Sequence, residues 1–143
     1  MPRLFNERVL YIAKDSMIYI KTTEEIELVR ESCMLVAKTL ALVSKSVQPG
    51  QITAELDKEA EQFIRDMGGI PAFKGYRGYP CTLCTSVNDQ VVHGIPGNYT
   101  LKEGDILSVD CGVYMNGFYG DSAYTFAVGE VDTSALKLME TTK

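Results

Sequence analysis

The stretch SVNDQVVHGIPGNYTLKEGDILSVDCGVYMNGFYGDSAYTF, residues 86–126, decides the fold of this chain. Near its centre, Asn116-Gly117 separates two runs, residues 106–114 and 118–126, that are rich in β-branched and aromatic side chains. Asn-Gly between such runs is the strongest short-range signal for a two-residue type I′ turn. The sequence therefore predicts a β-hairpin.

The same stretch contains two aspartates, Asp110 and Asp121, on one predicted face of this hairpin. A two-residue loop places Gly112 opposite Asp121 and Asp110 opposite Ala123. Because side chains alternate faces along a strand, the four residues share a face and the two carboxylates are diagonal neighbours. Diagonal Cα atoms lie about 7–8 Å apart, so two short side chains can converge on one site. The small Gly112 and Ala123 leave that space open.

Two converging carboxylates suit a pair of divalent metal ions, which lie about 3.5–4 Å apart in hydrolytic two-metal sites. The other face of the first strand is apolar and predicts core: Leu107, Val109, Cys111 and Val113. A solvated hairpin with surface aspartates is also compatible with this spacing, because Asp is common near turns. Four aromatic residues near the aspartates favour a covered cleft: Tyr114, Tyr119, Tyr124 and Phe126.

Three motifs in combination resemble the type I methionine aminopeptidases: TSVNDQVVHGIP at residues 85–96, GDI leading into VD at 104–110, and NGFYGD at 116–121. The resemblance extends from about Met17 to the C-terminus. It implies the pita-bread fold, an α/β (α+β) architecture whose two pseudo-symmetric halves enclose a dinuclear metal site. We expect one such half here, a mainly antiparallel sheet covered by two helices. Residues 1–16 would be an extension of unknown role.

The resemblance also implies the ligands of the site. Asp110 would chelate one of two divalent ions (Co, Mn, Fe, Zn or Mg), and Asp121 would bridge both. A histidine and two glutamates would come from the second half of the catalytic domain, whereas this chain contains a single histidine, His93. We expect residues 17–143 to be the first half only, ending inside a helix.

His93 lies in a His-Gly-Ile-Pro-Gly turn that projects its imidazole from a strand end. The resemblance implies a catalytic role in which His93 hydrogen bonds to the scissile amide or its tetrahedral intermediate. Without that context, such a histidine is more often an ordinary, partly buried residue than a catalyst.

Residues 70–80, IPAFKGYRGYP, predict a structured loop. The resemblance implies that this loop and the following strand line a pocket for the methionine side chain, with these substrate-binding residues: Phe73, Tyr76, Tyr79, Cys84 and His93. An aromatic, sulfur-lined pocket suits a thioether. Loop aromatics packed onto the core are compatible with the same residues.

Cys81 and Cys84 form a C-x-x-C pair that raises a redox or zinc hypothesis. A thioredoxin-type pair needs a helix directly after it, and a structural zinc needs two further ligands. The residues that follow instead predict a strand, which disfavours both.

The chain as a whole has the composition of a globular protein, with 45% hydrophobic residues and a net charge of −5. With 14 basic against 19 acidic residues, it has no broad surface for nucleic acid or anionic membrane. No apolar run approaches the roughly 18 residues of a membrane span. The four cysteines do not form a secreted framework, so we expect a cytoplasmic protein.

Two helices are predicted before the hairpin. Thr22 with Glu25 forms a capping-box pattern, and Gln48-Pro49-Gly50 ends the helix that follows. Its apolar stripe is predicted at Ile26, Val29, Cys33, Val36, Leu40, Val43 and Val47. A second helix begins at Thr53, with an apolar side formed by Leu56, Ala60, Phe63, Ile64 and Met67. We expect both to cover one face of the sheet, and a third helix to begin near Thr133.

The sequence thus predicts a metal-dependent exopeptidase that removes the initiator methionine of nascent proteins, with a transient ribosome contact left open. A non-catalytic pita-bread fragment, acting as a binding or scaffold module, is the alternative. A proline-specific relative with the same metal site is a third interpretation.

Overall fold

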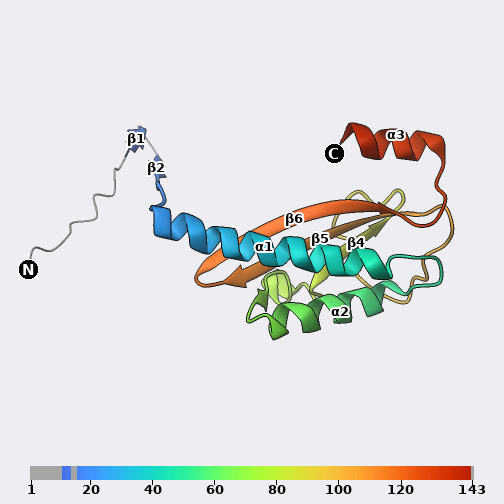
Figure 1. The fold of residues 1–143 in the computed structure, drawn as a ribbon, viewed down its shortest axis with the longest axis horizontal. Helices are drawn as coiled ribbons and strands as arrows, with labels where there is room; N and C mark the ends of the chain where they lie inside the picture. The colour runs from blue at the N-terminus through green and yellow to red at the C-terminus, as the bar shows by residue number, and fades with distance from the viewer. Residues whose placement is uncertain (1–10, 14–15, 143) are drawn as a thin grey trace, which may run out of the picture.

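The computed structural model describes residues 11–13 and 16–142, and it forms an antiparallel sheet covered on one face by two long helices (Figure 1). Most of the predicted extension, residues 1–16, lies outside the described residues. Of the part that is described, Tyr11–Ala13 is strand β1, which pairs antiparallel with β2, Ser16–Ile18, in a small separate sheet.

Helix α1, Thr23–Ser46, begins where the capping box predicts. The backbone N–H of Glu25 donates to Thr22 Oγ1 at 3.2 Å, and the N–H of Thr22 donates back to Glu25 Oε2 at 2.9 Å. Helix α2, Thr53–Asp66, follows after a short connection that contains Pro49. Both predicted helices are therefore confirmed.

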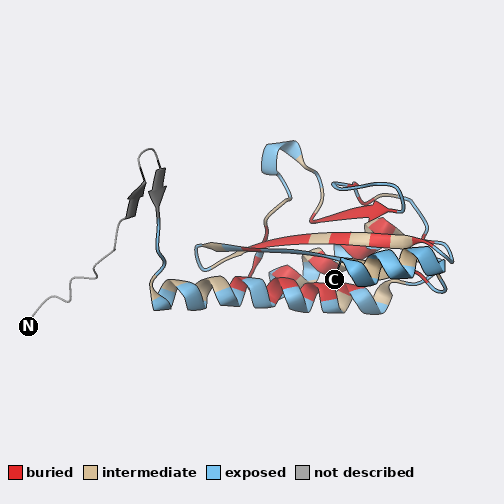
Figure 2. Ribbon diagram, turned by 90° about the horizontal axis from the view of Figure 1, so that it is seen from above, coloured by how far each residue is buried: buried red, intermediate tan, exposed pale blue. Residues whose placement is uncertain are grey.

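The predicted apolar stripe of α1 is wrong at two positions, because Ile26 and Cys33 are exposed. Ile26 lies in the first turns, which extend beyond the end of the hairpin (Figures 1 and 2). Near Cys33 the sheet-facing position belongs to Ser32, whose hydroxyl donates to the carbonyls of Met115 and Phe118. A pattern of apolar residues cannot anticipate a buried serine held by distant backbone groups. Met67, predicted on the apolar side of the second helix, is likewise exposed and lies directly after the end of α2.

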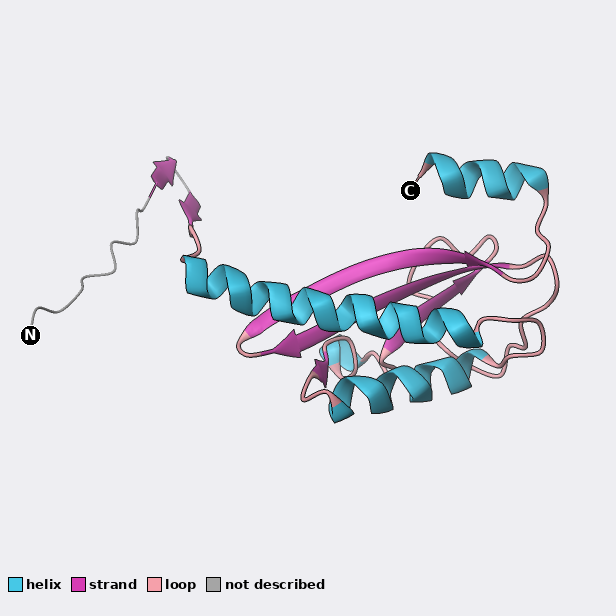
Figure 3. Cartoon of the chain, viewed as in Figure 1, coloured by secondary structure: helices cyan, strands magenta, loops and turns pink. Residues whose placement is uncertain are grey.

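Strand β5, Ile106–Met115, is the centre of the main sheet. It pairs antiparallel on one side with β4, Leu83–Val87, and β3, Ile70–Pro71, and on the other side with β6, Phe118–Ala127. The strands are magenta in Figure 3. The short 3₁₀ helix η1, Tyr76–Gly78, lies in the loop between β3 and β4.

The predicted hairpin register is confirmed at every pair that matters for the aspartates. Gly112 lies opposite Asp121, and Asp110 lies opposite Ala123. Asn116 and Gly117 both have positive φ, 54° and 86°, as a type I′ turn requires.

The helices α1 and α2 cover one face of the sheet, and the core lies between them and that face (Figure 2). The four β5 side chains predicted to be core are fully buried: Leu107, Val109, Cys111 and Val113. The third helix, α3, Thr133–Thr141, stands apart from the sheet (Figures 1 and 3). None of the helices in the described part of the chain combines the length and apolar character needed to cross a bilayer.

Strand β6 packs directly on the backbone of α1 at Gly120. A Cβ atom at this position would lie 2.6 Å from the backbone of both Ser32 and Cys33. Because the obstacle is helix backbone, it cannot rotate away as a side chain would. Gly120 therefore sets the distance between α1 and the hairpin.

Gly120→Ala should lower the free energy of unfolding by about 2–3 kcal/mol, because the added methyl group must push β6 away from α1. Urea unfolding measures this change. Gly97→Ala is the matched control, since its Cβ would meet only one atom, the Ile95 carbonyl oxygen at 3.8 Å. Equal losses in both variants would contradict the close packing at Gly120.

Candidate metal and substrate site

The two aspartates lie on the sheet face that α1 and α2 leave uncovered. Asp110 is half-buried in the middle of β5, and its Oδ1 atom is buried without a hydrogen-bond partner. Asp121 is exposed on β6. Gly112, between them, is covered by the ring of Phe73, which occupies the space that a Cβ would need. The predicted aromatic cover over the aspartates is not seen in the described residues, because Asp121 and Tyr119 are exposed.

The electrostatics of this face oppose the ionisation of Asp110. Burial raises the pKa of Asp110 to about 6, and the negative charge of Asp121 contributes in the same direction. The charge of His93 lowers it by a smaller amount. Two carboxylates in mutual repulsion, one with an unpartnered oxygen, form a site whose energy falls when a cation enters.

His93 lies in the loop after β4 and has a left-handed backbone, with φ of 59°. Its neighbour Gly94 is held against β4: the Thr85 N–H donates to the Gly94 carbonyl at 2.7 Å, and the Gly94 N–H donates to Ser86 Oγ at 3.1 Å. A Cβ at Gly94 would collide with the Thr85 carbonyl. The predicted projection of His93 from the end of a strand therefore matches its position.

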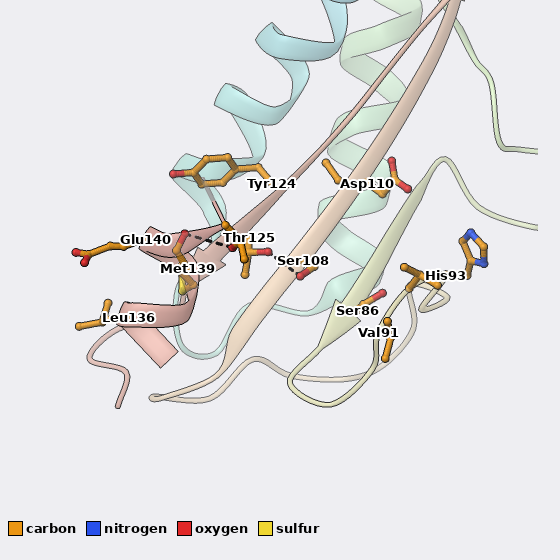
Figure 4. A pocket seen from close by; sticks show the side chains of 13 residues that line it. Ser86, Val91, His93, Ser108, Asp110, Tyr124, Thr125, Leu136, Met139 and Glu140 are labelled. Atoms are coloured by element: carbon orange, nitrogen blue, oxygen red, sulfur yellow. Dashed lines mark hydrogen bonds between the residues drawn. The ribbon is translucent and has the colours of Figure 1, made fainter. Parts of the chain in front are cut away.

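A cavity of about 560 Å³ opens beside Asp110 and His93 (Figure 4). Its floor includes three hydroxyl side chains, Ser86, Ser108 and Thr125, and the last two form a hydrogen bond of 2.8 Å. The remaining lining comes from the His93 loop, β6 and α3: Val91, Val92, Ala123, Tyr124, Leu136, Met139, Glu140 and Thr142. In Figure 4, His93 and the α3 residues lie on opposite sides of the cavity.

Of the predicted substrate-binding residues, His93 lines this cavity, whereas Phe73, Tyr76, Tyr79 and Cys84 are not among the residues that line it. Phe73 lies on Gly112, Tyr76 is exposed in η1, and Cys84 is buried on β4 directly opposite Asp110. The hydroxyl of Tyr79 donates to the backbone carbonyls of Leu83 and Gly94. Burial raises the pKa of the Cys84 thiol.

Sequence reasoning missed the hydroxyl side chains of the cavity. Ser108 lies two residues before Asp110 on β5, and Ser86 and Thr125 are opposite Ser108 on the flanking strands. Period-two alternation, applied to β5 and its neighbours, places all of them on the aspartate face. The contribution of α3 has no comparable signal in the sequence.

Comparison with known proteins identifies the family. Residues 27–143 match the model of metallopeptidase family M24. The chain belongs to this family. Methionine aminopeptidase of Clostridium acetobutylicum is 50% identical over 128 residues, which are 89% of this chain and 51% of that protein. Methionine aminopeptidase 1 of Bacillus subtilis is 47% identical over 127 residues, 89% of this chain and 51% of that protein.

Among solved structures, methionine aminopeptidase of Rickettsia prowazekii superposes with a TM-score of 0.86 at 36% identity, over 88% of this chain and 51% of that chain. The resemblance to methionine aminopeptidases and the pita-bread architecture, with an antiparallel sheet and helices, are thereby confirmed. This chain spans about half the length of the curated relatives that it matches.

Membership of a metallopeptidase family implies divalent metal ions, and the residues present fit part of such a site. Carboxylate oxygens are the ligands that hard divalent cations prefer, and the unpartnered Oδ1 of Asp110 is available. Within residues 11–13 and 16–142, no three His, Cys, Asp or Glu side chains gather closely enough to hold an ion. The described residues thus offer two candidate ligands.

Asp110→Asn should stabilise the metal-free chain at pH 7.5 by about 1–2 kcal/mol, a figure discounted from the full pKa shift because Asp110 is only half-buried. Burial, followed by Asp121, raises the folded-state pKa of Asp110 from 3.8 to about 6, so ionisation costs stability as the pH rises through that interval. At pH 4 the carboxyl is protonated in the folded chain and about half ionised in the unfolded chain, so most of the gain should vanish. Urea unfolding in the presence of a chelator, at both pH values, measures this difference.

The matched control for that experiment is Asp89→Asn, which removes the same charge from an exposed side chain. Its stability should change little at either pH. A gain in Asp89→Asn equal to that in Asp110→Asn would show that the net charge, and not the site, is responsible.

Proposed function

We propose that this chain contributes one half of the site of a metal-dependent aminopeptidase that removes the N-terminal methionine from nascent polypeptides. The convergence of Asp110 and Asp121 on an uncovered sheet face, with an unpartnered carboxylate oxygen, carries the proposal. The 45–50% identity to several methionine aminopeptidases supports it. Residues 17–143 then correspond to the first half of the catalytic domain.

Asp110 and Asp121 would hold the divalent ions. Such ions polarise a carbonyl group and lower the pKa of water, so that a nucleophile forms at neutral pH. Two aspartates supply at most four oxygens, whereas hard divalent cations take about six ligands. Residues 11–13 and 16–142 provide no third clustered His, Cys, Asp or Glu side chain to complete this set.

His93 is proposed as the proton-handling residue. Its side chain is exposed at the mouth of the cavity, and its charge interacts favourably with that of Asp110. From this position the imidazole would donate a hydrogen bond to the oxygen on which negative charge develops during peptide cleavage.

The methionine side chain is proposed to lie against the loop between β3 and β4. Phe73 covers Gly112, which separates the two aspartates along the face, so its ring lies beside the carboxylates. Sulfur–aromatic contacts are favourable, and the flexible methionine side chain adapts to an irregular surface. Tyr76 and Cys84 stay predicted members of this pocket. Contact with the ribosome and a cytoplasmic location stay predictions.

A second candidate function is that of a non-catalytic binding module. Three large apolar side chains on the His93 loop, Val91, Val92 and Ile95, are exposed, as is Leu138 on α3. Exposed apolar side chains gathered near one cavity are typical of interaction sites. Metal binding that depends on Asp110 and Asp121 distinguishes the enzymatic function from this one.

Calorimetric titration of the 143-residue chain with Mn²⁺ should show weak binding, with a dissociation constant of about 0.1–1 mM, because two carboxylates complete only part of a coordination shell. Asp110→Asn/Asp121→Asn should abolish it, whereas Asp89→Asn, combined with a second exposed change, Asp66→Asn, should not. Release of methionine from a Met-Ala peptide should not be measurable. Measurable turnover by residues 1–143 would refute the proposal of an incomplete site.

A further inference from the structure

We propose that Tyr79 is a positioning residue for His93: its hydroxyl group fixes the turn that presents the imidazole, instead of contacting the substrate. This inference rests on the proposed function of His93 and adds to it the group that holds His93 in place. It also assigns to Tyr79 a different role from the one that the sequence predicts.

The hydroxyl of Tyr79 joins two segments that are distant in the sequence. It donates to the carbonyl of Leu83, the first residue of β4, at 2.9 Å, and to the carbonyl of Gly94, the residue after His93, at 3.2 Å. A hydroxyl has one proton, so these two contacts share it. No donor capacity of Tyr79 is left for a substrate.

Two further hydrogen bonds hold the same glycine. The Gly94 carbonyl accepts from the Thr85 N–H, and the Gly94 N–H donates to Ser86 Oγ. Gly94 therefore lies against β4 with both of its backbone polar groups occupied, and there is no room for a side chain. The Cα–Cβ direction of the adjacent His93 is fixed by this attachment.

The turn needs such an attachment, because it has little packing of its own. The side chains on either side of His93 are exposed, by 86% at Val91, 63% at Val92 and 61% at Ile95. His93 also adopts a left-handed backbone, which costs about 1 kcal/mol or more for a residue with a side chain. Without hydrogen bonds to β4, both factors favour a different conformation.

The start of β4, to which Tyr79 is hydrogen bonded, is itself held in place by α2. Asp57, which is buried on α2, accepts hydrogen bonds from the backbone N–H groups of Thr82 and Leu83, at 2.9 and 2.7 Å. A continuous path of hydrogen bonds thus runs from α2 through Leu83 and Tyr79 to Gly94. Burial, followed by Cys84, raises the pKa of Tyr79 well above its usual value, so the hydroxyl remains a donor at all physiological pH values.

Tyr79→Phe in the full 143-residue chain tests this role by NMR. The variant should lower the hydrogen-exchange protection of the Gly94 amide by about five- to tenfold, because one of the bonds that hold the turn is lost. The amide of Val109, in the core of β5, should change only with global stability. Because His93 is the only histidine, its imidazole signals need no further assignment, and they should show increased mobility.

Tyr99→Phe is the matched control, because it also removes a single tyrosine hydrogen bond, donated to Asp105 Oδ2 at 3.0 Å. The Gly94 and His93 signals should stay as in the wild type. Unchanged Gly94 and His93 signals in Tyr79→Phe would overturn the proposal. An equal loss of protection at every amide would overturn it too, since the hydroxyl would then stabilise the whole fold.

A measurement on the wild-type chain keeps the proposal testable if Tyr79→Phe does not fold. The hydroxyl proton of Tyr79 should exchange slowly with water and show a nuclear Overhauser effect to the amide of Thr85 or Gly94. Rapid exchange without such a contact would overturn the proposal. None of these readouts uses catalysis or metal binding, so an absence of Mn²⁺ binding or a measurable release of methionine would bear on the proposed function alone.

Discussion

The register of the β5–β6 hairpin is the constraint on which the site depends. The Asn116-Gly117 turn fixes this register from the local side, since both residues adopt positive φ. The core fixes it independently, because a slip of one residue would turn Asp110 into the core and Val109 out to solvent. Burying an unpaired carboxylate while exposing a buried valine costs several kcal/mol. Turn and core therefore specify the same pairing.

Helix α1 holds the same hairpin in place from the helix-covered face of the sheet. Ser32 donates to carbonyls on both strands next to the turn, and Gly120 lets the helix backbone approach β6. One face of the sheet is consequently closed by α1 and α2, with four β5 side chains fully buried. The aspartates can only lie on the remaining face. The position of the site thus follows from the packing of the opposite face.

Much of this arrangement could be predicted from the sequence, because it depends on short-range signals. The Asn-Gly turn, the capping box at Thr22 and period-two alternation together predict the hairpin, the start of α1 and the shared face of Asp110 and Asp121. The features that escaped prediction depend on bonds between side chains and distant backbone groups. Ser32 bonds across 83 and 86 residues, and Tyr79 bonds across 15. No local pattern encodes such partners.

Among the described residues, unpartnered buried polar atoms occur on both faces of the sheet, and Asp110 is the ionisable residue among them. On the helix-covered face, Ser32 and Asp57 are buried and bonded to backbone groups, whereas Thr85 Oγ1, on the side of Val109, has no partner. On the open face, Asp110 has an unpartnered oxygen and a like-charged neighbour.

His93 adds a left-handed backbone on the same face. Each of these features costs stability in the metal-free chain, and together they surround one cavity. A cation between the aspartates would relieve the repulsion between them. The electrostatic cost of this half-site would therefore be removed by a bound ligand, which is the property expected of a functional site and not of a structural one.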